Sequence, residues 1–321
     1  MSKNNKSNIV DSLISNYLSA QFFIITLLLF TTTLHVFGQQ KPLRLFLIGN
    51  SFSQNASKFL PEISESGGHQ LVIGRAELPG CELKRHWESV VTNDQDASNP
   101  KGKPYAGKSL RELLSSGNWD VVTIQQYSLL SGDSNTYQPY AQNLYKLIKQ
   151  LQPHAEVVIH QTWAYRADAK NFGKIAGEER AKDQNVMWMK SRAAYHHLAQ
   201  TLKLRIVPVG DAIQRVNTNP KWGFKIDTTF NYESAEYPNL PNQTHSLNVG
   251  YHYDKNKKLT FDPNHANDAG CYLAGLVWYQ FLFDGDPNKI KFLPQGIDKE
   301  FAKVLKTAAK NVVKTSAKKT K

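Results

Sequence analysis

Short apolar runs alternate with longer amphipathic segments through most of the chain. The apolar runs are rich in β-branched residues and predict strands at residues 43–48, 70–75, 121–126, 156–163 and 205–210. The segments between and after them predict helices at residues 56–66, 109–114, 136–150, 178–202 and 269–282. Strands that alternate with helices in this way are typical of an α/β domain, whose parallel sheet is covered by helices on both faces.

Polar residues follow the predicted strands, at the edge of the sheet where domains of this class bind their ligands. They are Ser51, the loop containing Gly80, Gln125 with Gln126, Gln161 with Trp163, and Asp211. Ser51 directly follows Gly49-Asn50, where the first strand is expected to end. A serine at the start of a helix often caps that helix, but at this edge of the sheet it could also act on a ligand.

The two ends of the 321-residue chain differ from its middle. Residues 1–38 contain two lysines and then an apolar stretch at 22–38, which predicts a secretory signal peptide cleaved near Gly38-Gln39. An uncleaved anchor is the alternative, and it would be the chain's only contact with a membrane. Both interpretations predict an exported protein that is periplasmic or extracellular.

Residues 299–321 form a basic tail that dominates the charge of the chain. The tail holds eight lysines and one glutamate, and therefore +7 of the net charge of +12. Phe301, Val304, Leu305 and Ala308 recur at helical spacing, so the first part of the tail is expected to pack on the domain. A charge confined to one tail, with no recognition motif, does not favour nucleic-acid binding.

Cysteine and histidine spacing gives no indication of a metal or another cofactor. No C-x-x-C or H-E-x-x-H motif occurs, and we expect neither a metal site nor a cofactor. The two cysteines, Cys81 and Cys271, could pair in an oxidising compartment.

Asp262 and His265 stand three residues apart ahead of the last predicted helix. An aspartate at this distance can accept the Nδ1 proton of the imidazole and direct Nε2 outward, as a serine nucleophile requires of its base. Together with Ser51 they predict a catalytic triad. The simpler alternative is a surface hydrogen bond between Asp262 and His265.

These motifs resemble those of the SGNH hydrolases, also called the GDSL esterase superfamily, and most closely an uncharacterised, largely Bacteroidetes branch. The nucleophile block matches residues 48–53, the oxyanion-loop block matches Pro79-Gly80-Cys81, and the D-x-x-H block matches residues 262–265. Segments that resemble the branch itself are residues 81–87, Gln125-Gln126, 160–165 and 272–279.

The resemblance spans residues 43–282 and implies a flavodoxin-like three-layer α/β/α sandwich with a five-stranded parallel sheet. It places an SGNH hydrolase domain at residues 39–298, with an aromatic-rich insertion at about 217–260. It further implies Ser51 as the nucleophile, His265 as the base and Asp262 as the partner of that base.

The resemblance also implies an oxyanion hole made by the N–H groups of Ser51 and Gly80 and by an asparagine side chain after the third strand. This chain has no such asparagine, because Gln125 and Gln126 stand there. A glutamine amide offers the same donors, and we expect Gln126 to supply the third hydrogen bond, with Gln125 as the alternative. Either glutamine could instead brace the loops.

The insertion suggests the substrate. It interleaves polar residues with Trp222, Phe224, Phe230, Tyr232, Tyr237, Tyr251 and Tyr253. Aromatic rings with a polar rim suit sugar rings, although aromatic packing could also simply hold down a long loop. Further substrate-contacting candidates are Asn50, Gln125, Gln161, Trp163, Trp87 and Tyr165.

We therefore expect a serine esterase that removes O-acetyl groups from carbohydrate, with an acetylated glycan or another small ester as its partner. Three alternatives stay open: a lipid or thioester hydrolase with the same triad, a carbohydrate-binding protein on a degenerate esterase scaffold, and a structural envelope protein.

Overall fold

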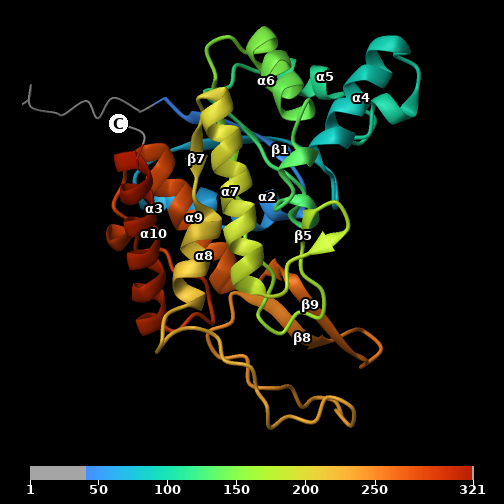
Figure 1. Ribbon diagram of the computed structural model, residues 1–321. Helices are drawn as coiled ribbons and strands as arrows, with labels where there is room; N and C mark the ends of the chain where they lie inside the picture. Colours follow the sequence, from blue (N-terminus) through green and yellow to red (C-terminus); the bar gives the residue numbers. More distant parts are fainter. Residues whose placement is uncertain (1–40, 320–321) are drawn as a thin grey trace, which may run out of the picture. The chain divides into compact units, whose positions relative to one another are not determined.

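Five parallel strands form the central sheet, in the order β2-β1-β3-β4-β7 (Figure 1). They are β1 (Leu43–Gly49), β2 (Leu71–Glu77), β3 (Val121–Ile124), β4 (Glu156–His160) and β7 (Arg205–Val207). β1 lies inside the sheet, since it pairs with β2 from Leu43↔Leu71 and with β3 from Leu45↔Val121. The five predicted strands are all present, and the predicted fold class is confirmed.

The computed structural model describes residues 41–319, with side chains up to residue 313. From Pro42 onward these residues belong to one compact unit. The predicted signal peptide or anchor at 1–38 lies outside the described residues. Among the residues that are described, no helix has both the length and the apolar character needed to span a bilayer.

Helices cover both faces of the sheet. Neighbouring residues of a strand point to opposite faces, so each strand packs against helices on both sides. Leu45 and Leu47 of β1 pack with one group of helices, and Phe46 and Ile48 pack with the other. The first group is α2 (Ser51–Ala56), α3 (Leu60–Ser66), α8 (Val209–Asn217), α9 (Asp268–Phe283) and α10 (Lys299–Lys319). The second group is α4 (Leu83–Gln95), α5 (Leu110–Ser115), α6 (Tyr140–Leu151) and α7 (Gln184–Leu202).

α9 is buried on all sides, as expected of a helix that is apolar all round. α10 covers it on the side away from the sheet (Figure 1). Phe301, Leu305 and Ala309 of α10 are buried and belong to the same core, so the first part of the basic tail packs on the domain as predicted.

Several element boundaries differ from the sequence expectation. The predicted helix at 56–66 begins only at Leu60, because Pro61 is tolerated only in a first turn, and a separate helix, α2, ends at Ala56. The predicted helix at 178–202 begins only at Gln184, capped by Asp183. Before it, β5 (Lys174–Ala176) and β6 (Glu179–Arg180) form a small hairpin.

A second hairpin within and after the aromatic insertion was not predicted. Its strands are β8 (Asn248–Tyr253) and β9 (Leu259–Ala266), which pair antiparallel, with Gly250 opposite Asp262. The Asp262–His265 segment is therefore the end of a strand rather than a free loop. The hairpin brings this segment to α2, which it contacts directly.

Candidate active site

Ser51, His265 and Asp262 form a line of hydrogen bonds at the carboxyl end of β1. The Oγ of Ser51 lies 2.9 Å from Nε2 of His265, although the two residues are 214 positions apart in the sequence. The Nδ1 of His265 lies 2.7 Å from Oδ2 of Asp262. We call these three residues the relay. The structure thus brings together all three side chains that the sequence motifs predicted as a triad.

The turn between β1 and α2 leaves the hydroxyl of Ser51 free for the imidazole. Asn50 is the N-cap of α2, and its Oδ1 accepts a hydrogen bond from the N–H of Phe52 at 3.0 Å. The capping role that Ser51 could have had therefore belongs to Asn50. Gly49 is needed here because a Cβ on it would lie 2.5 Å from Oγ of Ser53.

Asp262 uses its two oxygens for different tasks. Oδ1 accepts from the N–H groups of Asn264 and His265, both at 3.0 Å, and so closes the turn that carries the histidine. Oδ2 accepts from the imidazole. One carboxylate therefore both fixes the backbone of the turn and orients the ring, which selects the tautomer with a free Nε2.

Asp262 and His265 shift each other's pKa. Burial raises the pKa of Asp262, but hydrogen bonds from the side chain and backbone of His265 and from the backbone of Asn264 outweigh it and lower the pKa to about 2. The hydrogen bond to Asp262 raises the pKa of His265 above its usual value, against the opposing effect of burial. A proton taken up by His265 is therefore stabilised by Asp262.

Three groups donate hydrogen bonds to the carbonyl oxygens of Pro263 and Asn264, which lie between Asp262 and His265 at the end of β9. The O of Pro263 accepts from the N–H of Arg166 and from Nδ2 of Asn248, both at 2.9 Å. The O of Asn264 accepts from Nε1 of Trp163, also at 2.9 Å. Trp163 was predicted to contact substrate, but it is buried and stacked on Phe52. Its role in this structure is to support the turn.

The loop containing Gly80 is tied to the end of β1. The N–H of Leu78 donates to the O of Gly49 at 3.1 Å, and Nδ2 of Asn50 donates to the O of Cys81 at 2.9 Å. Gly80 itself is exposed and has a φ of 58°, a left-handed conformation that favours glycine. Asn50 was predicted to contact substrate, but its amide is fully buried and holds this loop instead.

Gln126 does not have the free donor that was predicted for it. It is fully buried, and its Nε2 donates to O and Oγ1 of Thr136, both at 3.0 Å. Its Oε1 accepts from the N–H groups of Leu83 and Tyr127. The amide of Gln126 therefore holds its own loop to Leu83 and to Thr136. This bracing role is the alternative that the sequence left open.

Gln125 is engaged in the same way. Its Nε2 donates to Oδ1 of Asn50 at 2.7 Å, and its Oε1 lies 2.7 Å from Nδ1 of His160. Burial lowers the pKa of His160 to about 3, so the ring is neutral and Nδ1 carries the proton that Oε1 accepts. His160, Gln125 and Asn50 thus form a buried chain that ends at the loop of Gly80.

The other predicted contact residues are also placed by the structure. Gln161 is buried and bonded to Asp211, with Nε2 2.8 Å from Oδ1. Tyr165 is buried, with its hydroxyl 3.2 Å from Oγ of Ser128. Trp87 of α4 is half-buried and packs against the core on that face of the sheet. Of the six predicted contact residues, only Trp87 is not buried.

The two cysteines are both free and buried. Burial raises the pKa of each thiol to about 12. The thiols are therefore protonated at neutral pH. Since both cysteines are free, they do not form the disulfide that the sequence left open.

Arg166 is a residue that the sequence analysis missed. Its guanidinium is almost fully buried and makes a two-bond ion pair with Asp168, at 2.7 and 2.8 Å. It also donates to Oε1 of Gln243 in the insertion. A Cβ on Gly250 would lie 1.8 Å from its Nη1, so only glycine fits opposite Asp262 in the hairpin.

Aromatic rings surround the same guanidinium. Its central carbon lies 4.5, 5.0 and 5.5 Å from the ring centres of Phe224, Phe261 and Tyr251. The rings come from the insertion, β9 and β8, and the arginine follows β4. Arg166 therefore connects the hairpin that carries Asp262 and His265 to the segment after β4. The R-x-D spacing after the fourth strand was the signal available in the sequence.

Replacing Arg166 with alanine should lower the free energy of unfolding by about 3–5 kcal/mol, because it leaves the carboxylate of Asp168 buried without its partner. Urea denaturation followed by tryptophan fluorescence measures this loss. Arg111→Ala is the matched control, since Arg111 makes the same two bonds to Asp94 at the surface, and its loss should be at most about 1 kcal/mol. Equal losses in the two variants would show that the buried ion pair of Arg166 and Asp168 stabilises the fold no more than the surface pair does.

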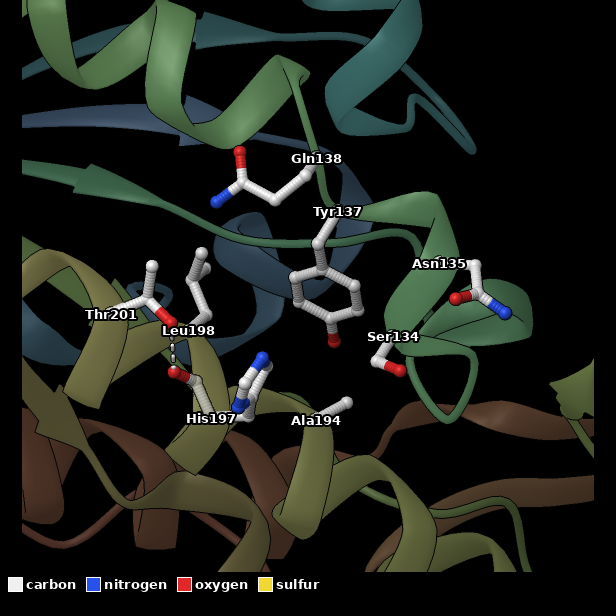
Figure 2. Close-up of a pocket in the computed structure, with 8 residues that line it drawn as sticks. All are labelled: Ser134, Asn135, Tyr137, Gln138, Ala194, His197, Leu198 and Thr201. Atoms are coloured by element: carbon white, nitrogen blue, oxygen red, sulfur yellow. Dashed lines mark hydrogen bonds between the residues drawn. The ribbon is translucent and has the colours of Figure 1, made fainter.

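Two cavities lie away from Ser51. One, of about 310 Å³, lies between α7 and the segment before α6, and Figure 2 shows its lining: Ser134, Asn135, Tyr137, Gln138, Ala194, His197, Leu198 and Thr201. The other, of about 840 Å³, includes residues 266–269, which directly follow His265. Neither of these two cavities is lined by a relay residue.

Comparisons with known proteins give a family and a fold. A family model described as "Domain of unknown function (DUF4886)" matches residues 44–237. A solved DUF4886 family protein from Bacteroides uniformis is 23% identical, with a TM-score of 0.63, over 85% of this chain and 95% of that one. This similarity shows that the two proteins share a fold. No curated protein matches the chain.

Other solved structures are more distant. A putative GDSL-like lipase from Parabacteroides merdae is 12% identical, with a TM-score of 0.43, over 75% of this chain and 95% of that one. A possible lipase from Chitinophaga pinensis is 14% identical, with a TM-score of 0.38, over 74% and 96%. The first of these two proteins is named as a member of the group that the sequence motifs resemble.

Proposed function

This chain belongs to the DUF4886 family, and we propose that it is a serine esterase of the SGNH hydrolase type. The observation that carries the proposal is the contact of Ser51 Oγ with His265 Nε2 at 2.9 Å, together with the bond from His265 to Asp262. A serine within hydrogen-bond reach of an oriented imidazole is the arrangement that acyl transfer requires.

In the proposed reaction the Oγ of Ser51 attacks the ester carbonyl while Nε2 of His265 takes the hydroxyl proton. Asp262 stabilises the imidazolium, which then gives its proton to the leaving alkoxide as the carbon–oxygen bond breaks. The acyl group is left on Ser51. Water attacks this acyl-enzyme while the same imidazole takes its proton. The imidazolium then gives a proton to Oγ of Ser51 as the bond between the acyl carbon and Oγ breaks, which releases the carboxylic acid and restores the serine. The N–H groups of Ser51 and Gly80 are the proposed donors to the oxyanion.

For the substrate we propose an O-acetyl group on carbohydrate. The support is a run of aromatic rings that ends beside Asp262: Phe230 lies 5.1 Å from Tyr232, Tyr232 lies 4.7 Å from Tyr251, and Tyr251 lies 4.2 Å from Phe261. Side chains of this kind, half-buried and with polar neighbours, suit the apolar faces of sugar rings. Export to the periplasm or outside, expected from residues 22–38, is part of the proposal.

The test compares purified protein on acetylated oligosaccharides, nitrophenyl acetate and a nitrophenyl ester with a long acyl chain. We expect kcat/KM to fall by at least about tenfold from acetyl to the long chain, because a site built for acetyl rejects added methylenes. Release of acetate from the oligosaccharides should exceed that from Ser51→Ala protein. A rate that rises with chain length would instead identify a lipid hydrolase.

A second candidate is a carbohydrate-binding protein without catalysis. The observation in its favour is that Gln126, which was expected to replace the missing asparagine, donates its amide N–H groups to Thr136. A fluorophosphonate probe distinguishes the two, since it reacts only with an activated serine. Labelling of Ser51 supports the esterase, whereas failure to label together with retained glycan binding supports the binding protein.

A further inference from the structure

Gln126, the residue expected to supply a side-chain donor from the segment after β3, donates its amide to Thr136 instead. In the sheet order, β3 is the direct neighbour of β1, so residues that follow β3 lie beside the Gly49–Ser51 turn. Gln125 and Gln126 are both buried and bonded to other groups. The next residue in the chain is Tyr127, and it is half-buried.

Tyr127 has a fixed backbone and a ring that faces the oxyanion loop. Its N–H donates to Oε1 of Gln126 at 2.9 Å, and its O accepts from the N–H of Leu130 at 2.9 Å. A Cβ placed on Gly80 would lie 3.8 Å from Cε2 and Cζ of the ring and 4.0 Å from the hydroxyl oxygen. The phenol therefore lies against the residue whose N–H is a proposed oxyanion donor.

Tyr127 and Asp262 share a neighbour, Tyr165. The pKa of Tyr165 is raised to about 12, mainly by burial, and both Tyr127 and Asp262 contribute to the rise. These two groups therefore lie within electrostatic reach of one phenol. The contact with Gly80 and the position directly after β3, the neighbour of β1, put the ring of Tyr127 at the same edge of the sheet as Ser51.

The hydroxyl of Tyr127 is unlike those of the buried tyrosines. Tyr137 and Tyr165 each bond through the hydroxyl, to the O of Ser131 and to Oγ of Ser128. Within residues 41–319, the hydroxyl of Tyr127 bonds to no other group. It is therefore free to donate to a ligand.

We propose that the hydroxyl of Tyr127 is the third oxyanion donor, in the position that an asparagine amide would otherwise fill. This inference rests on the proposed esterase function. As Ser51 attacks, negative charge develops on the carbonyl oxygen, and the phenol donates a hydrogen bond to it alongside the two N–H groups. The proton stays on the phenol, and the hydrogen bond strengthens as the charge forms.

The test is Tyr127→Phe, which removes one oxygen atom and keeps the ring. We expect kcat on nitrophenyl acetate to fall by about a hundredfold, with KM changed by less than about threefold, because the lost bond acts on the transition state. The affinity for an acetyl trifluoromethyl ketone, which forms a tetrahedral adduct with the serine, should fall by a similar factor. Tyr145→Phe on α6 is the matched control and should keep wild-type kinetics.

The outcomes separate this inference from the proposed function. If Tyr127→Phe keeps its kcat while Ser51→Ala is inactive, the hydroxyl is not a donor and the esterase assignment stands. A rise in KM alone would make Tyr127 a substrate contact and would also overturn the inference. If Ser51→Ala itself keeps full turnover, the proposed function fails.

Discussion

Replacing Ser51 with alanine should lower kcat on nitrophenyl acetate by about 10⁴-fold or more, because the reaction loses its nucleophile. Folding should be unaffected, since the hydroxyl of Ser51 bonds to the half-exposed ring of His265 and the helix cap is provided by Asn50. The measurement is steady-state kinetics, with circular dichroism to check the fold. Mass spectrometry after fluorophosphonate treatment should find the adduct on Ser51 in the wild type.

Ser53→Ala is the matched control for this result. Ser53 lies two residues further along α2 in the same I-G-N-S-F-S segment, and its Oγ is buried and donates to the O of Asn50 at 2.7 Å. Its loss should cost about 1 kcal/mol of stability and leave turnover of the same order. If Ser53→Ala were inactive and Ser51→Ala active, the nucleophile would be misassigned.

The pH dependence of kcat/KM should report His265. The imidazole must be neutral to accept the proton of Ser51, so activity should rise with pH through an apparent pKa above the usual histidine value of about 6.5. The direction follows from Asp262, whose hydrogen bond raises the pKa of His265 by stabilising the charged ring. Because the pKa of Asp262 is about 2, the carboxylate stays charged over the whole measured range.

Asp262→Asn should move this acidic limb to lower pH and reduce kcat by about 10⁴-fold. The substitution removes the main cause of the raised pKa, leaves burial to lower it, and allows the wrong tautomer of the ring. Asp268→Asn is the control, since Asp268 is exposed and pairs with Lys58. An unchanged pH profile in Asp262→Asn would show that Asp262 does not act on the imidazole.

The sheet and the relay could be predicted because both depend on simple patterns. Strand positions follow from short apolar runs, and the carboxyl ends of parallel strands meet at one edge. Ser51 after the first strand and an aspartate three residues before a histidine therefore pointed to a shared site. The predicted fourth and fifth strands were too long because β4 ends at His160 and β7 at Val207, although residues 161–163 and 208–210 that follow them are still buried.

Side-chain directions could not be predicted from the same patterns. Gln126 offers the right chemical group after β3, but the partner of its amide is Thr136, which a short helical turn brings back to it. Arg166 was missed because a charged residue is expected at the surface unless a partner is known, and its partners come from three separate segments. The hairpin of β8 and β9 was missed because Gly250 and Pro263 interrupt its alternation.

α10 has a consequence for how the chain reaches its final structure. α10 is the last described element of the chain, yet Leu305 and Ala309 are completely buried against elements that precede it. A nascent chain without α10 would expose an apolar surface, which is the condition under which partly folded chains associate.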